Sequence, residues 1–346
     1  MVPQTPSPNR FITYKDIASH CGVSLMTVSR VIRNQGNVKD STRNRVLAAA
    51  EELGYRPNPM VQTLMTGVRR RHVSIEANLA WISTYDPHHP PSFHWIDIHE
   101  SARERAKMLG YGLETISLFE ASLPVKTLKR MLRSRRVAGI IIAPLVTPGT
   151  ELPVPWDDYP TATIGRSLIW PRIHYTMAHF QHIMDQILEE LSKRGYRKIA
   201  YLDDSAMLQR QDHSALMAYE YHVNRAPPAN RFPPCSCEGW SSRDLKNWIG
   251  KHKPDAVISG STQIHDMLLD AGFSVPDELG YATLSWRDTR PDCAGVRHPF
   301  REMGAGVVDL VVAQIHRNER GIPPHSKAML LEGDWVEGST LRSTGK

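Results

Sequence analysis

The sequence is poor in cysteine and contains no long apolar run. Only four cysteines occur among 346 residues, and the single C-x-C pair, Cys235 and Cys237, has no second pair to complete a zinc site. We therefore expect no bound metal and no cofactor. No stretch approaches the roughly 18 apolar residues of a membrane span, and the opening MVPQTPSPNRF lacks the apolar centre of a signal peptide. These absences indicate a cytoplasmic protein without a membrane partner.

Motifs of several enzyme classes are also missing. The chain has no G-x-x-x-x-G-K-[ST] phosphate loop, no G-x-G-x-x-G dinucleotide turn and no G-x-S-x-G nucleophile elbow. His88, His89, His94 and His99 gather in one proline-rich stretch, but they lack the i, i+4 spacing of a helical metal site, so a cleft lip is the better interpretation. We expect no enzymatic activity.

Acidic residues are scarce in the first fifth of the chain. From Met1 to His72 there are eleven Lys and Arg against four Asp and Glu, a net charge of +7 (11 − 4). The rest of the chain has 31 basic and 32 acidic side chains, so the whole positive surplus lies at the N-terminal end. This bias is typical of a polyanion-binding module attached to a near-neutral body.

Three short helical patterns fill this basic segment, over residues 13–21, 24–32 and 40–54. Thr13, Ser24 and Asp40 are suited to cap them, because their side-chain oxygens can accept from the first free backbone N–H groups. Gly22 stands between the first two helices, where it allows the chain to reverse sharply. The spacing predicts a helix-turn-helix.

Strands and helices alternate from Val73 onward. The expected strands are ANLAWIS, GLETISL, VAGIIIAP, TATIG, KIAYLD, DAVISG and GYATLS, and helical patterns cover 98–110, 125–135, 181–195, 242–252, 263–272 and 304–318. This alternation predicts parallel sheets covered by helices, and about 270 residues are enough for two of them. We expect a ligand cleft between the two halves, because open α/β sheets bind ligands at the carboxyl ends of their strands.

Several short motifs occur at fixed places along the chain. In the first sixty residues they are D-I-A, G-V-S, T-V-S-R-V, T-R-x-R-V and L-G-Y-x-P-N, and in the body GYRKIAYL, DAVISG, GVRHP and EGDWVEGSTLR. Together they resemble the lac repressor / galactose repressor (LacI) family of bacterial transcription factors. The resemblance implies an N-terminal all-α helix-turn-helix DNA-binding domain and an α/β periplasmic-binding-protein-like body of two parallel-sheet subdomains. It further implies a homodimeric, sequence-specific regulator, most often a repressor, of near-palindromic operator DNA.

The expected organisation follows from composition and resemblance together. A disordered arm (1–10), the DNA-binding domain (11–56) and a hinge linker (57–72) precede the body (73–346). Within the body, the N-subdomain is expected to comprise about 73–166 and 296–325, and the C-subdomain about 167–295 and 326–342. The apolar helical pattern GAGVVDLVVAQI fits either a dimer interface or the core.

The second helix of a helix-turn-helix lies in the major groove of DNA. Arginine can bond guanine through two hydrogen bonds, and apolar side chains can pack on thymine methyl groups. The residues placed to reach base edges are Leu25, Met26 and Arg30. The small hydroxyl residues placed to bond phosphates are Ser24, Thr27 and Ser29. By resemblance, further DNA contacts come from Thr13, Tyr14, Asn34, Tyr55 and Asn58.

The linker is apolar where a flexible tether would be rich in Gly and Ser. In the family that it resembles, this segment folds as a hinge helix on operator DNA, and a leucine from each subunit enters the minor groove at the centre of the site. The resemblance places that leucine at Leu64. Unstacking a base step costs a few kcal/mol, and the larger interface with bent DNA offsets this cost.

The expected cleft lacks acidic residues. Relatives that respond to sugars hold them with carboxylates, and the corresponding places here hold none. The remaining candidate effector-binding residues are aromatic, basic or small: Phe93, Trp95, Arg166, His179, Phe180, Thr262, Ser285 and Trp286. This set suits a planar or anionic small-molecule effector, or a sugar stacked on tryptophan. The alternatives are a cleft that binds no effector and a solute-binding receptor without DNA function.

Overall fold

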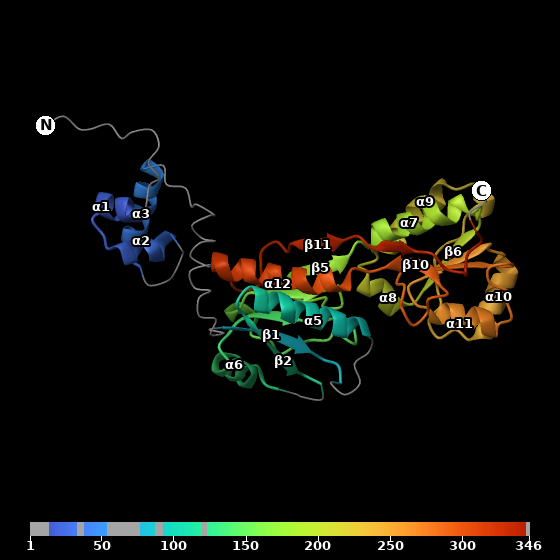
Figure 1. Cartoon of the computed structure of the whole chain (residues 1–346), viewed down its shortest axis with the longest axis horizontal. Helices are drawn as coiled ribbons and strands as arrows, with labels where there is room; N and C mark the ends of the chain where they lie inside the picture. Colours follow the sequence, from blue (N-terminus) through green and yellow to red (C-terminus); the bar gives the residue numbers. More distant parts are fainter. Residues whose placement is uncertain (1–13, 33–37, 54–76, 87–92, 120–122, 344–346) are drawn as a thin grey trace.

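The structure is a computed structural model that describes residues 14–32, 38–53, 77–86, 93–119 and 123–343 (Figure 1). Three helices come first, at the places that the sequence predicts: α1 (Tyr14–Cys21), α2 (Leu25–Ile32) and α3 (Asp40–Glu52). The expected arm and hinge linker lie outside the described residues. Within the described ranges, no helix combines the length and the apolarity that crossing a lipid bilayer requires.

The three N-terminal helices pack around a small apolar core. Ile17 of α1, Val28 of α2 and Val46 of α3 are fully buried in it. Gly22 has φ +63°, a backbone conformation that side-chain-bearing residues rarely adopt, and it makes the reversal between α1 and α2. The backbone N–H of Thr27 donates to Ser24 Oγ at 3.1 Å, so Ser24 caps α2 as predicted.

The start of α3 differs from the prediction. Lys39 is the N-cap residue and makes no side-chain cap hydrogen bond, while Asp40 is the first residue inside the helix. The expectation that Asp40 caps α3 is therefore wrong. Its carboxylate still lies in the first turn, where a negative charge interacts favourably with the helix dipole.

The first subdomain of the body is built on a six-stranded parallel sheet in the order β11-β5-β4-β3-β1-β2. Its strands are β1 (Asn78–Ser83), β2 (Gly112–Ser117), β3 (Val137–Ile142), β4 (Thr161–Ile164), β5 (His174–Ala178) and β11 (Ala328–Leu331). Its helical elements are α5 (Phe93–Met108), α6 (Val125–Ser134), the short η1 (Trp156–Asp158) and α12 (Phe300–Arg317). The central strands β3 and β4 are almost entirely buried, which explains their continuous apolar sequences.

The second subdomain has a six-stranded sheet in the order β12-β10-β9-β8-β6-β7. Its strands are β6 (Ile199–Asp203), β7 (Cys235–Ser236), β8 (Ala256–Ser259), β9 (Gly280–Thr283), β10 (Ala294–Arg297) and β12 (Asp334–Val336). Its helical elements are α7 (Phe180–Lys193), α8 (Ser205–Arg210), α9 (Ser214–Arg225), η2 (Pro228–Asn230), α10 (Ser242–His252) and α11 (Gln263–Asp270). The strands are parallel except β12, which pairs with β10 antiparallel.

The chain crosses between the two subdomains three times: after β5, after β10 and after β11. The structure thus places β5 and β11 in the first sheet, whereas the expected boundaries assign 167–178 and 326–331 to the second subdomain. These strands are short, and β11 alternates between exposed and half-buried residues. Their position depends on pairing with β4 and with each other, which local sequence does not encode.

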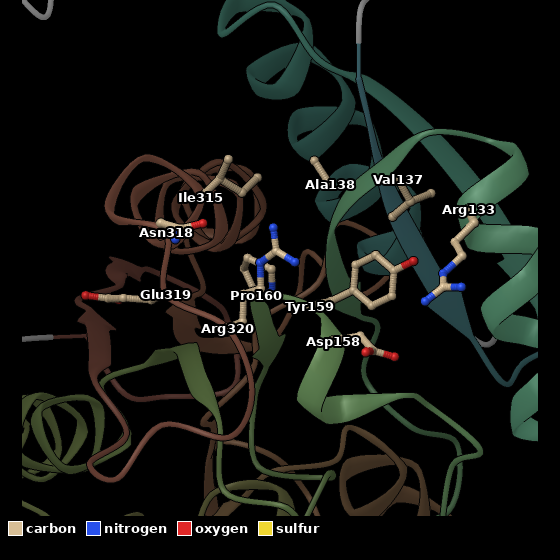
Figure 2. A pocket seen from close by; sticks show the side chains of 10 residues that line it. All are labelled: Arg133, Val137, Ala138, Asp158, Tyr159, Pro160, Ile315, Asn318, Glu319 and Arg320. Atoms are coloured by element: carbon tan, nitrogen blue, oxygen red, sulfur yellow. The ribbon is translucent and has the colours of Figure 1, made fainter. Parts of the chain in front are cut away.

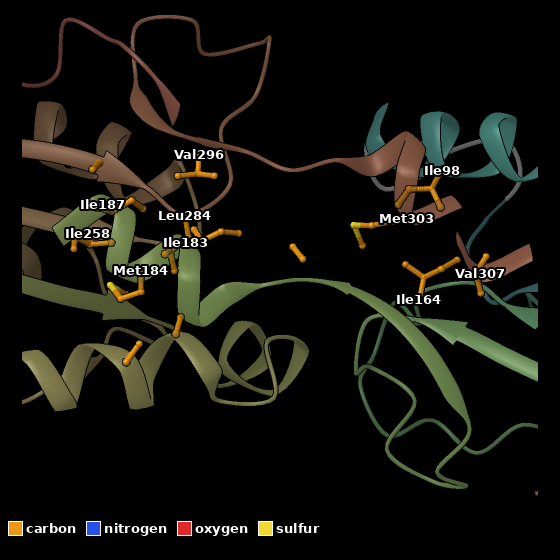
Figure 3. Packing of buried hydrophobic residues seen from close by; sticks show 14 of the residues in the cluster. Ile98, Ile164, Ile183, Met184, Ile187, Ile258, Leu284, Val296, Met303 and Val307 are labelled. Atoms are coloured by element: carbon orange, nitrogen blue, oxygen red, sulfur yellow. The ribbon is translucent and has the colours of Figure 1, made fainter. Parts of the chain in front are cut away.

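Helix α12 belongs to the core of the first subdomain. Val307, Val308 and Val311 are fully buried, which confirms the expectation that this apolar helix contributes to the core. A Cβ on Gly304 would lie 2.2 Å from the carbonyl oxygen of Ile98, so α12 and α5 approach closely there. Buried side chains continue from Met303 and Ile98 on this side to Leu284 and Ile183 of the second subdomain (Figure 3).

Candidate nucleic-acid interface and ligand cleft

Helix α2 has both buried and exposed apolar side chains. Val28 and Val31 are buried in the helical core, whereas Leu25 and Met26 are 54% and 64% exposed at the start of the same helix. Arg30 is also exposed, one turn further on. Large apolar side chains at exposed positions are unfavourable in water, so the face formed by Leu25, Met26 and Arg30 is suited to contact another molecule. We call it the α2 face.

Small hydroxyl residues border the α2 face. Ser24 and Thr27 share a hydrogen bond of 2.8 Å between their hydroxyl oxygens, and Ser29 is half-buried. Tyr14 at the start of α1 is half-buried and packs against the helical core. Five of the predicted DNA contacts lie outside the described residues: Thr13, Asn34, Tyr55, Asn58 and Leu64.

A cleft of about 290 Å³ lies between the two subdomains. On the first side it is lined by residues that follow β3, β4 and β5, among them Pro144 and Gly165. On the second side it is lined by residues that follow β8 and β9, among them Gly260 and Ser285. The cleft is therefore at the carboxyl ends of both parallel sheets, where ligands of open α/β folds bind.

Four of the predicted effector residues line this cleft: Trp95, Arg166, Phe180 and Ser285. Three others do not: His179, Thr262 and Trp286. His179 lies at the first crossover, where its backbone N–H donates to the carbonyl of Leu331 and its ring stacks on His182. Trp286 is buried with Arg297 stacked on its ring at 4.4 Å, and Thr262 precedes α11. The side chain of Phe93 lies outside the described part of the structure.

Three arginines line the cleft, and no carboxylate is among its described lining residues. Arg166 comes from the first subdomain, stacks on Tyr175 at 4.8 Å and has its Nε atom 3.4 Å from a carboxylate oxygen of Asp212. Arg210 comes from α8 in the second subdomain, and Arg287 follows β9. Burial lowers the pKa of both Arg210 and Arg287, so their charges are stabilised less than in water.

Two of the cleft arginines make polar contacts that join the subdomains. The guanidinium of Arg210 donates to the backbone carbonyls of Leu145, at 2.8 Å, and of Val146, both in the first subdomain. Arg166 and Asp212 form the second contact, an ion pair between the two sides. A ligand that competes for either arginine would therefore change how the subdomains are held together.

Asp203, the last residue of β6, lies behind two residues that line the cleft. Its side chain is 3% exposed. Its Oδ2 atom accepts from Tyr201 Oη at 2.9 Å, Gln211 Nε2 at 3.3 Å and the N–H of Gly260 at 3.2 Å, and its Oδ1 atom accepts from the N–H of Asp204. Burial raises the pKa of Asp203 to about 7, although these donors oppose the shift.

Comparison with known proteins decides the family. Residues 13–58 match the model of bacterial regulatory proteins of the lacI family, and residues 188–341 match the periplasmic binding protein-like domain. The HTH-type transcriptional regulator GntR of Escherichia coli (strain K12) is 24% identical over 87% of this chain and 91% of its own length. The chain belongs to the LacI family. As a LacI-family protein it is a DNA-binding transcriptional regulator.

Further comparisons cover the DNA-binding domain and the fold. Over 57 residues, 16% of this chain and 17% of the relative, the chain is 49% identical to the transcriptional regulator GalS of Salmonella typhimurium. A regulator CelR–cellobiose complex has the same fold, with a TM-score of 0.59, 19% identity and coverage of 95% of this chain and 99% of that one. The lac repressor dimer bound to operator and an anti-inducer gives a TM-score of 0.54 at 20% identity, over 96% and 99% of the two chains.

Several residues of this LacI-family cleft were not predicted from the sequence. They include Met207, Arg210, Gln211, Arg287, His298 and Phe300. A usable signal existed for two of them: Arg287 follows a predicted strand end by two residues, and His298 lies in the GVRHP motif at the second crossover. No such signal existed for Arg210, because α8 was not predicted and only tertiary packing brings the Arg210 side chain to the first subdomain.

A second pocket, of about 350 Å³, lies at the opposite end of the first sheet (Figure 2). It is formed near the starts of β3 and β4 and the end of α12, and its charged residues are of both signs: Arg133, Arg320, Asp158 and Glu319. Asp158 pairs with Lys129 at 2.5 Å. Because this pocket lies away from the carboxyl strand ends and has mixed charge, the cleft is the better candidate for the ligand site.

Proposed function

We propose that this LacI-family regulator is a cytoplasmic, homodimeric repressor of a near-palindromic operator, without catalytic activity. The exposed α2 face is the observation that carries the proposal. Leu25 and Met26 lie at the N-terminal end of α2, the end whose side chains reach base edges in a helix-turn-helix complex. Two-fold symmetry of the protein explains a two-fold operator, since one three-helix module offers too little surface to bind tightly alone.

The residues of the α2 face and the hydroxyl residues that border it make different contacts with DNA. Arg30 bonds a guanine edge, while Leu25 and Met26 pack against thymine methyl groups. Ser24, Thr27 and Ser29 bond phosphates, which fix the position of the helix along the groove. Among the residues outside the described ranges, Thr13, Asn34, Tyr55 and Asn58 add backbone contacts, and Leu64 enters the minor groove.

A small molecule in the cleft sets the affinity for DNA. It binds between the subdomains, and the contacts of Arg210 and Arg166 across the cleft are the points at which it alters their arrangement. The relative placement of the two subdomains determines the spacing of the linkers in a dimer, and therefore of the two helix-turn-helix units. A ligand that prefers one arrangement shifts the population between DNA-competent and DNA-incompetent states.

Selection of bound sequences from a random DNA library tests this function. The full-length protein should enrich a near-palindromic motif, and its affinity should fall steeply as salt rises. Arg30→Ala should bind DNA weakly and lose preference at one position of each half-site, by about 1–3 kcal/mol. Arg45→Ala removes the same charge from an exposed site on α3 and should keep the motif. Absence of any enriched motif, or an unchanged motif with Arg30→Ala, contradicts the assignment.

A further inference from the structure

The cleft of this regulator carries positive charge that the protein itself leaves unneutralised. Among the residues that the structure describes, Arg166 is the only one of the three cleft arginines with a carboxylate within ion-pair distance, that of Asp212. Arg210 donates to two backbone carbonyls, which carry no full charge, and only the more distant Asp204 stabilises its charge. Three positive charges against one adjacent negative charge leave a local excess of about two.

Two of these guanidinium groups also have an N–H donor that makes no hydrogen bond. The Nε atoms of Arg166 and Arg287 are buried and make no hydrogen bond. For Arg166 the oxygen of Asp212 at 3.4 Å is close enough for an ion pair but lacks hydrogen-bond geometry. The residue as a whole is only 6% exposed. Buried charged donors without acceptors are costly, so a ligand that supplied acceptor oxygens here would lower the free energy of the site.

The three arginines lie on both sides of the cleft. Arg166 belongs to the first subdomain, and Arg210 and Arg287 belong to the second. One bound group can therefore accept hydrogen bonds from both subdomains at once. Guanidinium groups bind carboxylate and phosphate oxygens through paired, charge-assisted hydrogen bonds, which are roughly twice as strong as neutral ones. A neutral sugar hydroxyl would leave the charge uncompensated.

The remainder of the lining is apolar and aromatic. Trp95, Phe180 and Phe300 contribute rings, and methionines and aliphatic residues complete the wall. A volume of about 290 Å³ is near the lower limit of small-molecule sites. Such a cavity holds a single ring with its acidic group, and the ring can pack against the aromatic side chains.

We propose that the effector of this regulator is a small organic acid with one ring and one or two negative charges, a carboxylate or a phosphate ester, held by Arg166, Arg210 and Arg287. This inference rests on the proposed effector role of the cleft. Because the acid binds both subdomains, it favours the arrangement in which both sets of arginines reach it. Carboxylate and phosphate sources share the same recognition chemistry, and the test separates them.

Ligand-dependent thermal unfolding of the full-length protein tests the proposal. The probes are inorganic phosphate and matched pairs at constant ionic strength: glucuronate against glucose, glucose 6-phosphate against glucose, and benzoate against benzyl alcohol. We expect phosphate and at least one acid to raise the Tm, while each neutral partner leaves it unchanged. Which acid is effective distinguishes a carboxylate from a phosphate source. Equal stabilisation by acid and neutral partners, or none by phosphate and all acids, overturns the proposal.

Variants locate the binding to the arginines. Arg287→Gln should weaken binding of the effective acid about ten- to hundredfold by calorimetry, the loss of one charge-assisted contact. Arg166→Gln tests the opposite wall of the cleft in the same way, and it replaces the first variant if that one does not fold. Arg243→Gln removes the same charge from an exposed position on α10 and should leave the affinity unchanged. Unchanged affinity in both cleft variants contradicts the proposal.

The outcome is separable from that of the proposed function. Operator selection measures the α2 face and is run with and without the acids, so its failure under both conditions would leave acid binding intact. Conversely, a protein that selects its operator but is stabilised only by neutral sugars would refute the acidic effector alone.

Discussion

Replacing Asp203 by asparagine should remove a pH-dependent loss of stability from the second subdomain. Burial raises the pKa of this carboxyl from its ordinary value of 3.8 to about 7 in the folded protein. Between these values the folded state keeps a proton that the unfolded state has released. The contribution of Asp203 to the free energy of unfolding is therefore fully present below about pH 4. It falls as pH rises towards 7, by about 1.4 kcal/mol per pH unit and about 4 kcal/mol in all.

Asparagine keeps the shape of the side chain but has one acceptor oxygen. With that oxygen in place of Oδ2 it still accepts from Tyr201, Gln211 and Gly260, and its amide then faces the N–H of Asp204. One buried donor left unpaired costs about 1–3 kcal/mol at every pH. The variant should thus be less stable than the wild type near pH 4.5 and equally or more stable at pH 8.

Urea unfolding of the full-length proteins from pH 4.5 to 8 measures this crossing. Intrinsic fluorescence of the eight tryptophans, which include Trp240 and Trp248 of the second subdomain, follows the unfolding. Subtracting the free energy of unfolding of the wild type from that of the variant at each pH removes the contributions of the other titrating groups. Asp204→Asn is the control, because asparagine can still cap α8 by accepting from the N–H of Met207. A pH-independent difference for Asp203→Asn would refute the reasoning and show that the four donors outweigh burial.

Two further predictions concern the hinge and the core. Leu64→Ala should reduce operator affinity and DNA bending, because the apolar wedge is shortened; wild-type bending in a phasing assay would argue against the wedge. Gly304→Ala should destabilise the protein by about 1–3 kcal/mol, since its Cβ would meet the carbonyl of Ile98. Gly250→Ala in α10 meets no atom within 4 Å and should instead stabilise by about 0.5–1 kcal/mol, so equal Tm shifts for the two would contradict the packing argument.

The DNA-binding helices were predictable because their signals are local. Gly22 at the turn, Ser24 as a cap and the buried positions Ile17, Val28 and Val46 are each determined by a few neighbouring residues. Helical spacing alone places Met26 away from the core, whereas Leu25 is three residues before the buried Val28 and its exposure depends on its position in the first turn of α2. The prediction that Asp40 caps α3 was wrong, because cap geometry depends on where the backbone leaves the helical conformation.

The cleft was predictable in position but only partly in composition. Its place follows from the rule that parallel strands bind ligands at their carboxyl ends, and Arg166 and Ser285, which each closely follow a strand, were identified through the family resemblance. Trp286 was misplaced because neighbouring residues beyond a strand point in opposite directions, and Arg297 covers its ring. Arg210 depended on a helix that the pattern of apolar residues did not mark.

Helix α8 links the buried carboxyl of Asp203 to the first subdomain. Its N-cap directly follows Asp203, and a Cβ on Gly260 would collide with Met207 of the helix, so α8 is seated closely on the end of the second sheet. At its other end Arg210 bonds carbonyls of the first subdomain. A relative rotation of the subdomains must therefore break those hydrogen bonds or move α8 away from the end of the second sheet. A spectroscopic label on exposed Ser205 or Gln209 would sense that movement directly, which makes this short helix the natural place to observe the response of the regulator to its effector.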